Sequence, residues 1–143
     1  MDTDEEIEKI LNEISITENS KGLKQIMDRN TQVIDAIYSD VLKYEINIKN
    51  KQEVSTFIHN NFEYIELNKD TKSCWICYLD NSTFYNLRIH MRGLFIKFKT
   101  KETILLKYNK KYFVVNINEK VFFKKINNKD LIKMHLIDAL SNK

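Results

Sequence analysis

Two cysteines and a histidine in the middle of the chain have a spacing that approaches a zinc site. Two residues separate Cys74 from Cys77, and twelve separate Cys77 from His90. A structural zinc ion takes four ligands, but residues 93–95, where the fourth is expected, are Gly, Leu and Phe. Cysteines three apart on a regular strand also point to opposite faces of the sheet. The segment therefore predicts a β-strand that carries two thiols and binds no metal.

Other catalytic patterns in the chain are incomplete as well. The three histidines lie far apart, and no Ser or Cys stands in a nucleophile-elbow pattern. Asp70-Thr71-Lys72 matches the acid-x-lysine element of a metal-dependent nuclease, with Glu63 or Glu66 as an upstream acid, but it lies in a predicted turn. Two glycines in the whole chain exclude a glycine-rich phosphate loop. We predict a non-enzymatic protein without a cofactor.

Charge is distributed unevenly along the sequence. Residues 1–20 hold seven acids and one base, whereas residues 84–133 hold thirteen Lys and Arg against three acids. A basic surface attracts phosphates or acidic proteins, although a lysine-rich solvated surface would give the same count. The uneven distribution indicates that the C-terminal half makes the contacts with a charged partner.

The basic residues of this half interleave with aromatic residues. Arg88, His90 and Arg92 share one side of an expected strand, and Lys97 and Lys99 lie on the outer face of the next one. Exposed rings beside lysines can stack bases and contact phosphates. The nucleic-acid-binding residues that we predict are Arg88, His90, Arg92, Lys97, Lys99, Lys110 and Lys111.

The first part of the chain has the apolar period of helices. A capping box at Thr3 and Glu6 precedes a short amphipathic helix over residues 4–15. A long helix is expected from residue 22 to residue 49, and its apolar seam is Ile34, Ile37, Val41, Tyr44 and Ile48. This seam supports an alternative function, in which a viral or phage protein-interaction factor dimerises or docks on a host protein through the long helix.

From Phe62 onward the apolar period changes to two. The alternating runs are FEYIEL, CWICYL, YNLRIHM, LFIKFK, TILLKY, YFVVNI and VFFKKI. Short polar turns between them permit hairpins only, which predicts an antiparallel meander of five to seven strands. A helix over residues 129–140 follows and is expected to pack on the sheet through Ile132, Leu136, Ala139 and Leu140. The predicted class is α+β, with helices in residues 1–61 and the sheet and last helix in residues 62–143, as one compact unit.

The sequence has no apolar run of the length that a membrane span needs. Its first ten residues are acidic, where a secretory signal would be basic and then apolar. We therefore expect a cytoplasmic protein of bacterial or viral origin with no membrane contact.

One stretch resembles a known family. Asp70-Thr71-Lys72-Ser73, the strand that follows, the Asp80-Asn81 turn and the Leu87-Arg88 pair are similar to the accessory domain behind the nuclease domain in bacterial proteins related to the N-terminal region of type I restriction R subunits. The resemblance covers residues 49–140. The family's nuclease domain has no counterpart here, so no catalytic residue carries over. The resemblance implies a non-catalytic nucleic-acid or assembly module in restriction or defence.

Overall fold

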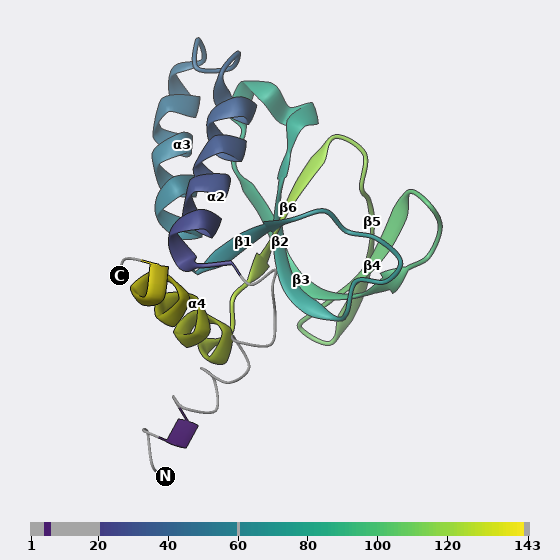
Figure 1. Cartoon of the computed structure of the whole chain (residues 1–143). Coiled ribbons are helices and arrows are strands. Elements are labelled where there is room, and N and C mark those ends of the chain that lie inside the picture. Colours follow the sequence, from purple (N-terminus) through teal and green to yellow (C-terminus); the bar gives the residue numbers. More distant parts are fainter. Residues whose placement is uncertain (1–4, 7–20, 60, 142–143) are drawn as a thin grey trace.

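The computed structural model describes residues 5–6, 21–59 and 61–141 of the 143-residue chain. The helix and capping box expected near the N-terminus lie outside these residues, except for Glu5 and Glu6. The elements in chain order are α2 (Leu23–Tyr38), α3 (Glu45–Ile58), β1 (Phe62–Ile65), β2 (Cys74–Asp80), the 3₁₀ helix η1 (Asn81–Asn86), β3 (Ile89–Phe98), β4 (Thr103–Tyr108), β5 (Lys111–Asn116), β6 (Lys120–Lys125) and α4 (Asn128–Ser141) (Figure 1). This arrangement confirms the α+β class.

The six strands form one antiparallel sheet in the order β1-β6-β2-β3-β4-β5. The predicted meander holds for β2 to β5, where each strand pairs with the next. β6 instead returns across the sheet and pairs with both β1 and β2. Its return places β1 and β5 at the two edges of the sheet.

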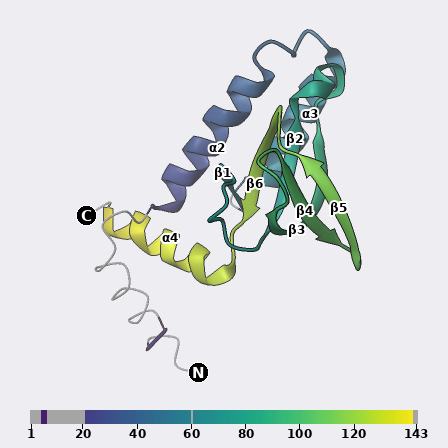
Figure 2. The ribbon, with the colours of Figure 1, turned by 90° about the vertical axis from the view of Figure 1, so that its right-hand side faces the viewer.

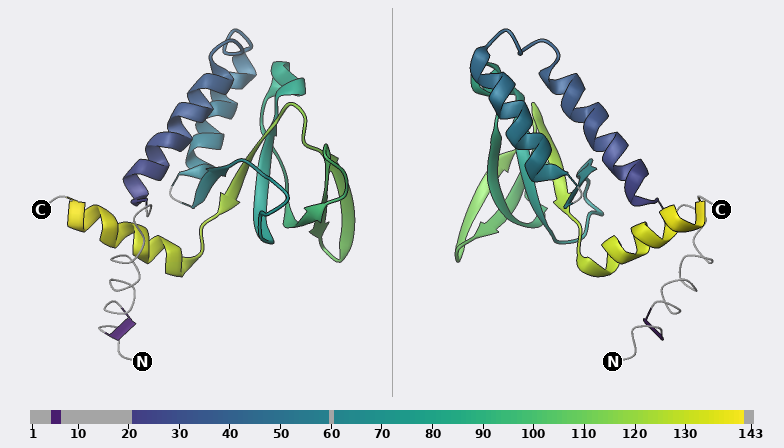
Figure 3. Two further views of the ribbon diagram at one scale, coloured as in Figure 1. Left: turned by 45° about the vertical axis from the view of Figure 1, so that its right-hand side comes forward. Right: turned by 90° about the vertical axis from the view of Figure 1, so that its left-hand side faces the viewer.

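The prediction of one long helix over residues 22–49 is wrong. The chain leaves the helix after Tyr38 and starts α3 at Glu45, and the two helices lie side by side as a pair (Figure 3). Folding the helix back buries Ile34 and Tyr38 in one cluster with Val54 and Ile58. Burial of four large side chains outweighs the hydrogen bonds that a continuous helix would keep across the turn.

As a result, the five residues of the predicted seam lie in different environments. Ile34 is buried, and Ile37 and Val41 pack against the same core. Tyr44 precedes α3 at its N-terminus, and Ile48 is half-exposed on α3. These five residues therefore do not form the intermolecular stripe that the sequence predicts.

The sheet is buried on both faces near its middle, as β2 shows. Cys77 and Leu79 face the α2–α3 pair, whereas Ile76 and Tyr78 face a second core on the other side. The second core gathers side chains from β2 to β6, so the sheet curves around it (Figure 2). Cys74 packs on the second core and Cys77 lies in the first, which confirms that the two thiols point to opposite faces.

β3 is a single bent strand where the sequence predicts two. Its pairing shifts between Ile76 and Tyr78 of β2, and again between Phe95 and Lys97, so that β3 contributes one extra residue each time. Each bulge reverses the in-and-out phase of the residues that follow. Strict alternation would place Phe95 on the outer face with Lys97 and Lys99, but Phe95 is fully buried in the second core.

α4 packs on α2 and not on the sheet. Leu131 and Met134 contact the cluster formed by Leu23, Ile26 and Ile126. Ile132 and Leu140, expected to face the sheet, are exposed. Asn127 caps the N-terminus of α4, because its Oδ1 accepts the backbone N–H of Asp130 at 2.8 Å. Among the helices that the structure describes, none has the length and apolar character required to cross a membrane.

Candidate nucleic-acid interface

The helices leave part of one sheet face uncovered. α2 and α3 pack over β1, β6, the end of β2 and the first residues of β3, while the same face of β4, of β5 and of β3 from Leu94 onward carries no helix in the described structure (Figures 2 and 3). The register places Trp75, Leu94, Lys107 and Tyr112 opposite one another on four successive strands. We call this set the aromatic row.

Both rings at the ends of the aromatic row are open to solvent. Trp75 is 50% exposed and Tyr112 is 60% exposed. The Lys107 ammonium lies 5.6 Å from the centroid of the Tyr112 ring. Three strand spacings of about 4.8 Å separate the two rings, or about 14 Å along the row. A cation between two exposed rings can hold a phosphate while bases stack on either side.

A second row lies beside the first on this face. Lys97 and Leu105 are partners across β3 and β4, and Leu105 pairs in turn with Val114, which is 55% exposed. Lys97 is exposed, and so is Lys99, two residues further along the strand direction. The uncovered face thus combines exposed aromatic, aliphatic and cationic side chains.

The surrounding charge is almost entirely positive. Residues 88–116 contain eight Lys and Arg and one acid, Glu102. The ion pairs found among the described residues are Lys49–Glu53, Lys51–Asp35 and Lys120–Asp80, and none of them involves this segment. Its cations therefore have no internal carboxylate partner in the described structure and remain able to contact phosphate.

The β4–β5 turn carries Lys110 at its tip. Asn109 has φ 50° and Lys110 has φ 65°, the conformation of a type I′ hairpin turn. Lys111 pairs with Tyr108, one step beyond the Lys107–Tyr112 pair, so its side chain points to the opposite side of the sheet. Only Lys97 and Lys99 of the predicted lysines lie on the uncovered face itself.

The predicted trio of Arg88, His90 and Arg92 does not share one face, because the first bulge of β3 lies between His90 and Arg92. The His90 ring stacks on Tyr78 with 5.9 Å between centroids, and its Nε2 is buried without a hydrogen-bond partner. The Arg92 guanidinium instead lies 5.1 Å from the Phe57 ring of α3. These residues border a groove of about 480 Å³ between α3 and β3.

The two thiols are poorly suited to metal binding or redox chemistry. Burial raises the pKa of Cys77 to about 12, against a smaller opposing effect of Arg92. Burial also raises the pKa of Cys74, with Lys124 opposing it. Within the part of the chain that the structure describes, no three His, Cys, Asp or Glu side chains converge as metal ligands would.

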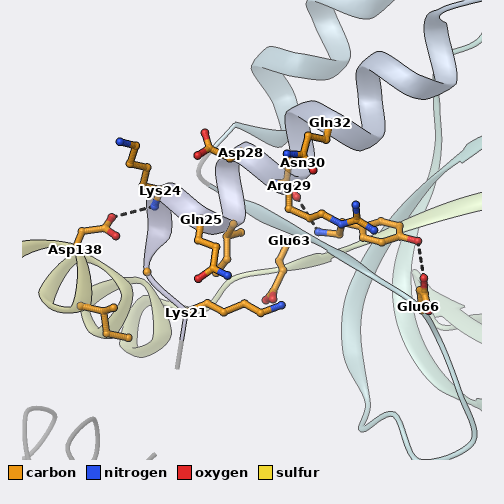
Figure 4. Close-up of a pocket in the computed structure, with 14 residues that line it drawn as sticks. Lys21, Lys24, Gln25, Asp28, Arg29, Asn30, Gln32, Glu63, Glu66 and Asp138 are labelled. Carbon is orange, nitrogen blue, oxygen red and sulfur yellow. Dashed lines mark hydrogen bonds between the residues drawn. The ribbon is translucent and has the colours of Figure 1, made fainter. Parts of the chain in front are cut away.

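A larger cavity, of about 810 Å³, lies between α2, β1 and α4 (Figure 4). Its polar groups connect the elements around it. Asp138 of α4 accepts the backbone N–H of Lys24 at 2.9 Å and so caps α2, which has Gly22 at its N-cap. Tyr64 donates to Glu66 at 3.1 Å. The lining mixes acids and bases, which suits packing of the elements better than binding of a charged ligand.

The sequence analysis missed the aromatic row. Trp75 and Tyr112 lie in the alternating runs CWICYL and YFVVNI, and neither is among the residues predicted to bind nucleic acid. The signal was present in the alternation of both strands, but the cross-strand register that places Trp75 in line with Lys107 and Tyr112 cannot be obtained from single strands. Comparisons with protein-family models, characterised proteins and solved structures found no match to this chain.

Proposed function

We propose that the protein is a non-enzymatic module that binds single-stranded nucleic acid on the uncovered face of β2 to β5. The observation that carries the proposal is the aromatic row, in which two exposed rings flank Lys107. Aromatic side chains stack bases of any sequence, and lysines beside them track the phosphate backbone.

A single strand fits this face better than a duplex. The second core lies on the inner side of the curved sheet, so the uncovered face is convex. A convex face cannot enclose a duplex, whereas a flexible single strand can follow it and turn its bases toward the rings. Stacking on Trp75 and Tyr112 requires bases that are not already paired.

Fluorescence anisotropy with 12-nucleotide DNA and RNA strands, at low and near-physiological salt, tests this proposal. We expect Trp75→Ala and Tyr112→Ala each to weaken binding by between about fivefold and a hundredfold, the cost of one stacked base. Lys97→Ala is expected to lower the slope of log affinity against log salt by about 0.7, as for one lost phosphate contact.

A matched control is Tyr85→Ala. Tyr85 is 58% exposed, close to the 60% of Tyr112, but it lies on η1 away from the aromatic row. Its replacement should leave the affinity unchanged. Absence of binding at low salt, or an equal loss in the Tyr85 variant, would contradict the proposal.

Two broader assignments accompany this function. We propose a cytoplasmic location for the protein. We also propose a role in restriction or defence, which the resemblance of residues 49–140 to the accessory domains of restriction R-subunit relatives implies. The alternative of docking through a long helix is not kept, because that helix is divided in two.

A further inference from the structure

The first four residues of β3 have a strand partner on one side only. β3 pairs with β2 from Ile89 onward, but its pairing with β4 begins at Leu94. In the described structure, Ile89 to Arg92 therefore present a strand edge without a neighbour. Alternate N–H and C=O groups of this edge point away from β2 and can accept another strand.

A helix runs along this open edge. The groove between them is lined on the helix side by Asn50, Glu53, Val54 and Phe57, which recur at the spacing of one helix face. A groove between a strand edge and a helix is the arrangement in which an extended peptide adds to a sheet. Main-chain hydrogen bonds then supply affinity, and the helix wall selects side chains.

Buried hydrogen bonds fix the position of β3 relative to the helices at one end of the groove. Tyr38 donates its hydroxyl to the Leu87 carbonyl, and Asn47 Oδ1 accepts the Leu87 N–H at 2.8 Å. Both Tyr38 and Asn47 are fully buried. The chain therefore enters β3 in a fixed position relative to α3, which reduces the entropic cost of binding a peptide there.

The charge around the groove favours an acidic ligand. Arg88 and Arg92 are exposed and border it, and its one acid, Glu53, lies 3.9 Å from the Lys49 ammonium. Phe57, which is partly exposed, provides the apolar wall, and Val54 beside it is 2% exposed and belongs to the core. An extended segment that alternates acidic and apolar residues complements both features.

We propose that the groove between α3 and the open edge of β3 binds an acidic, extended segment of a partner protein, which adds to the sheet as a strand. Carboxylates of the segment contact Arg88 and Arg92, and its apolar side chains face Phe57. This site is separate from the uncovered face proposed for nucleic acid and goes beyond that function.

The probe is a fluorescent nine-residue peptide of alternating Glu and Val, compared with one of alternating Lys and Val. The acidic peptide should bind at least tenfold more tightly. Because strand pairing uses the N–H groups of alternate residues, N-methylation of all Val or of all Glu should have unequal effects. One methylated peptide should lose at least tenfold in affinity, and the other should stay within about twofold.

Variants of the protein separate the two surfaces. The double variant Arg88→Glu, Arg92→Glu should bind the acidic peptide at least tenfold more weakly. Lys97→Glu should bind the peptide with unchanged affinity and should reduce only oligonucleotide binding. Amide exchange in the unaltered protein provides a readout without substitutions. Backbone amides of residues 89–92 should become protected by the peptide and not by an oligonucleotide.

Three results would overturn the proposal. One is no peptide binding at millimolar concentration, and another is equal loss on both N-methylations, which excludes strand pairing. The third is protection of residues 89–92 by self-association or by oligonucleotide, which would assign the groove to a second copy of the chain or to nucleic acid.

Discussion

The side-chain amide of Asn30 pairs with the backbone of Tyr64 as a neighbouring strand would. Asn30 Oδ1 accepts the Tyr64 N–H at 2.8 Å, and its Nδ2 donates to the Phe62 carbonyl at 2.8 Å. Asn30 is 3% exposed, so both bonds are shielded from water. One helix side chain thus closes the edge of β1 and blocks that edge to other strands.

Replacing Asn30 by Ala should therefore destabilise the protein. The change leaves a buried N–H and a buried C=O without partners, at a cost of about 1–3 kcal/mol for each group. Urea unfolding followed by tryptophan fluorescence measures the loss. Asn81→Ala, at an exposed position, is the matched control and should shift the free energy of unfolding by less than about 0.5 kcal/mol. Equal effects of the two variants would refute the role assigned to Asn30.

Asp80 should make stability depend on pH. Burial alone would raise the pKa of its carboxyl, but hydrogen bonds from the Ser82 hydroxyl and N–H, with Lys120 and His90 nearby, lower that pKa overall. A carboxyl with a lowered pKa stabilises the fold above its unfolded value of about 3.9. This contribution is lost as the pH falls through the lower folded value.

Unfolding free energies measured from pH 6 to pH 2 test the assignment. Asp80→Asn should be less stable than the unaltered protein at pH 6 and should lose less stability on acidification. Asp40→Asn, in the exposed turn after α2, serves as the control. If Asp80→Asn has an unchanged acid profile, the hydrogen bonds of Ser82 do not contribute as inferred.

Cys77 should be the less reactive of the two thiols. It is completely buried with a pKa of about 12, so at pH 8 it is both protonated and inaccessible, while Cys74 is partly exposed. Titration with a thiol-specific chromogenic disulfide should label one equivalent in the native protein and two in urea. Cys74→Ser should abolish the native labelling. Rapid labelling of both thiols before unfolding would contradict the buried position of Cys77.

Lys110→Gly should stabilise the β4–β5 hairpin. Lys110 has φ 65°, a left-handed conformation that costs a residue with a side chain about 1 kcal/mol and costs glycine little. The midpoint of urea unfolding should rise accordingly. Lys110→Ala removes the same charge without relieving the backbone, so it should not raise the midpoint. If the midpoint rises in both variants, the gain in stability comes from the lost charge and not from the backbone conformation.

The sequence alone determined which segments form strands and which kinds of side chain the surface carries. Alternation in CWICYL predicted that Cys74 and Cys77 lie on opposite faces, and the structure confirms it. The cap that Asn127 provides for α4 is likewise a local feature, since it joins residues three positions apart. These features depend on residues within a few positions of one another, so periodicity and capping rules are sufficient to identify them.

Only the tertiary structure decided where elements end and what they face. The break after Tyr38 depends on Asn47, whose amide bonds the carbonyl of Phe84 and the N–H of Leu87, about forty residues away. The bulges of β3 likewise arise from pairing with β2 and β4 and turn Arg92 toward α3. A repeat of apolar residues allows a helix to continue, but burial against distant residues decides whether it does, because the larger share of the folding free energy lies in those contacts.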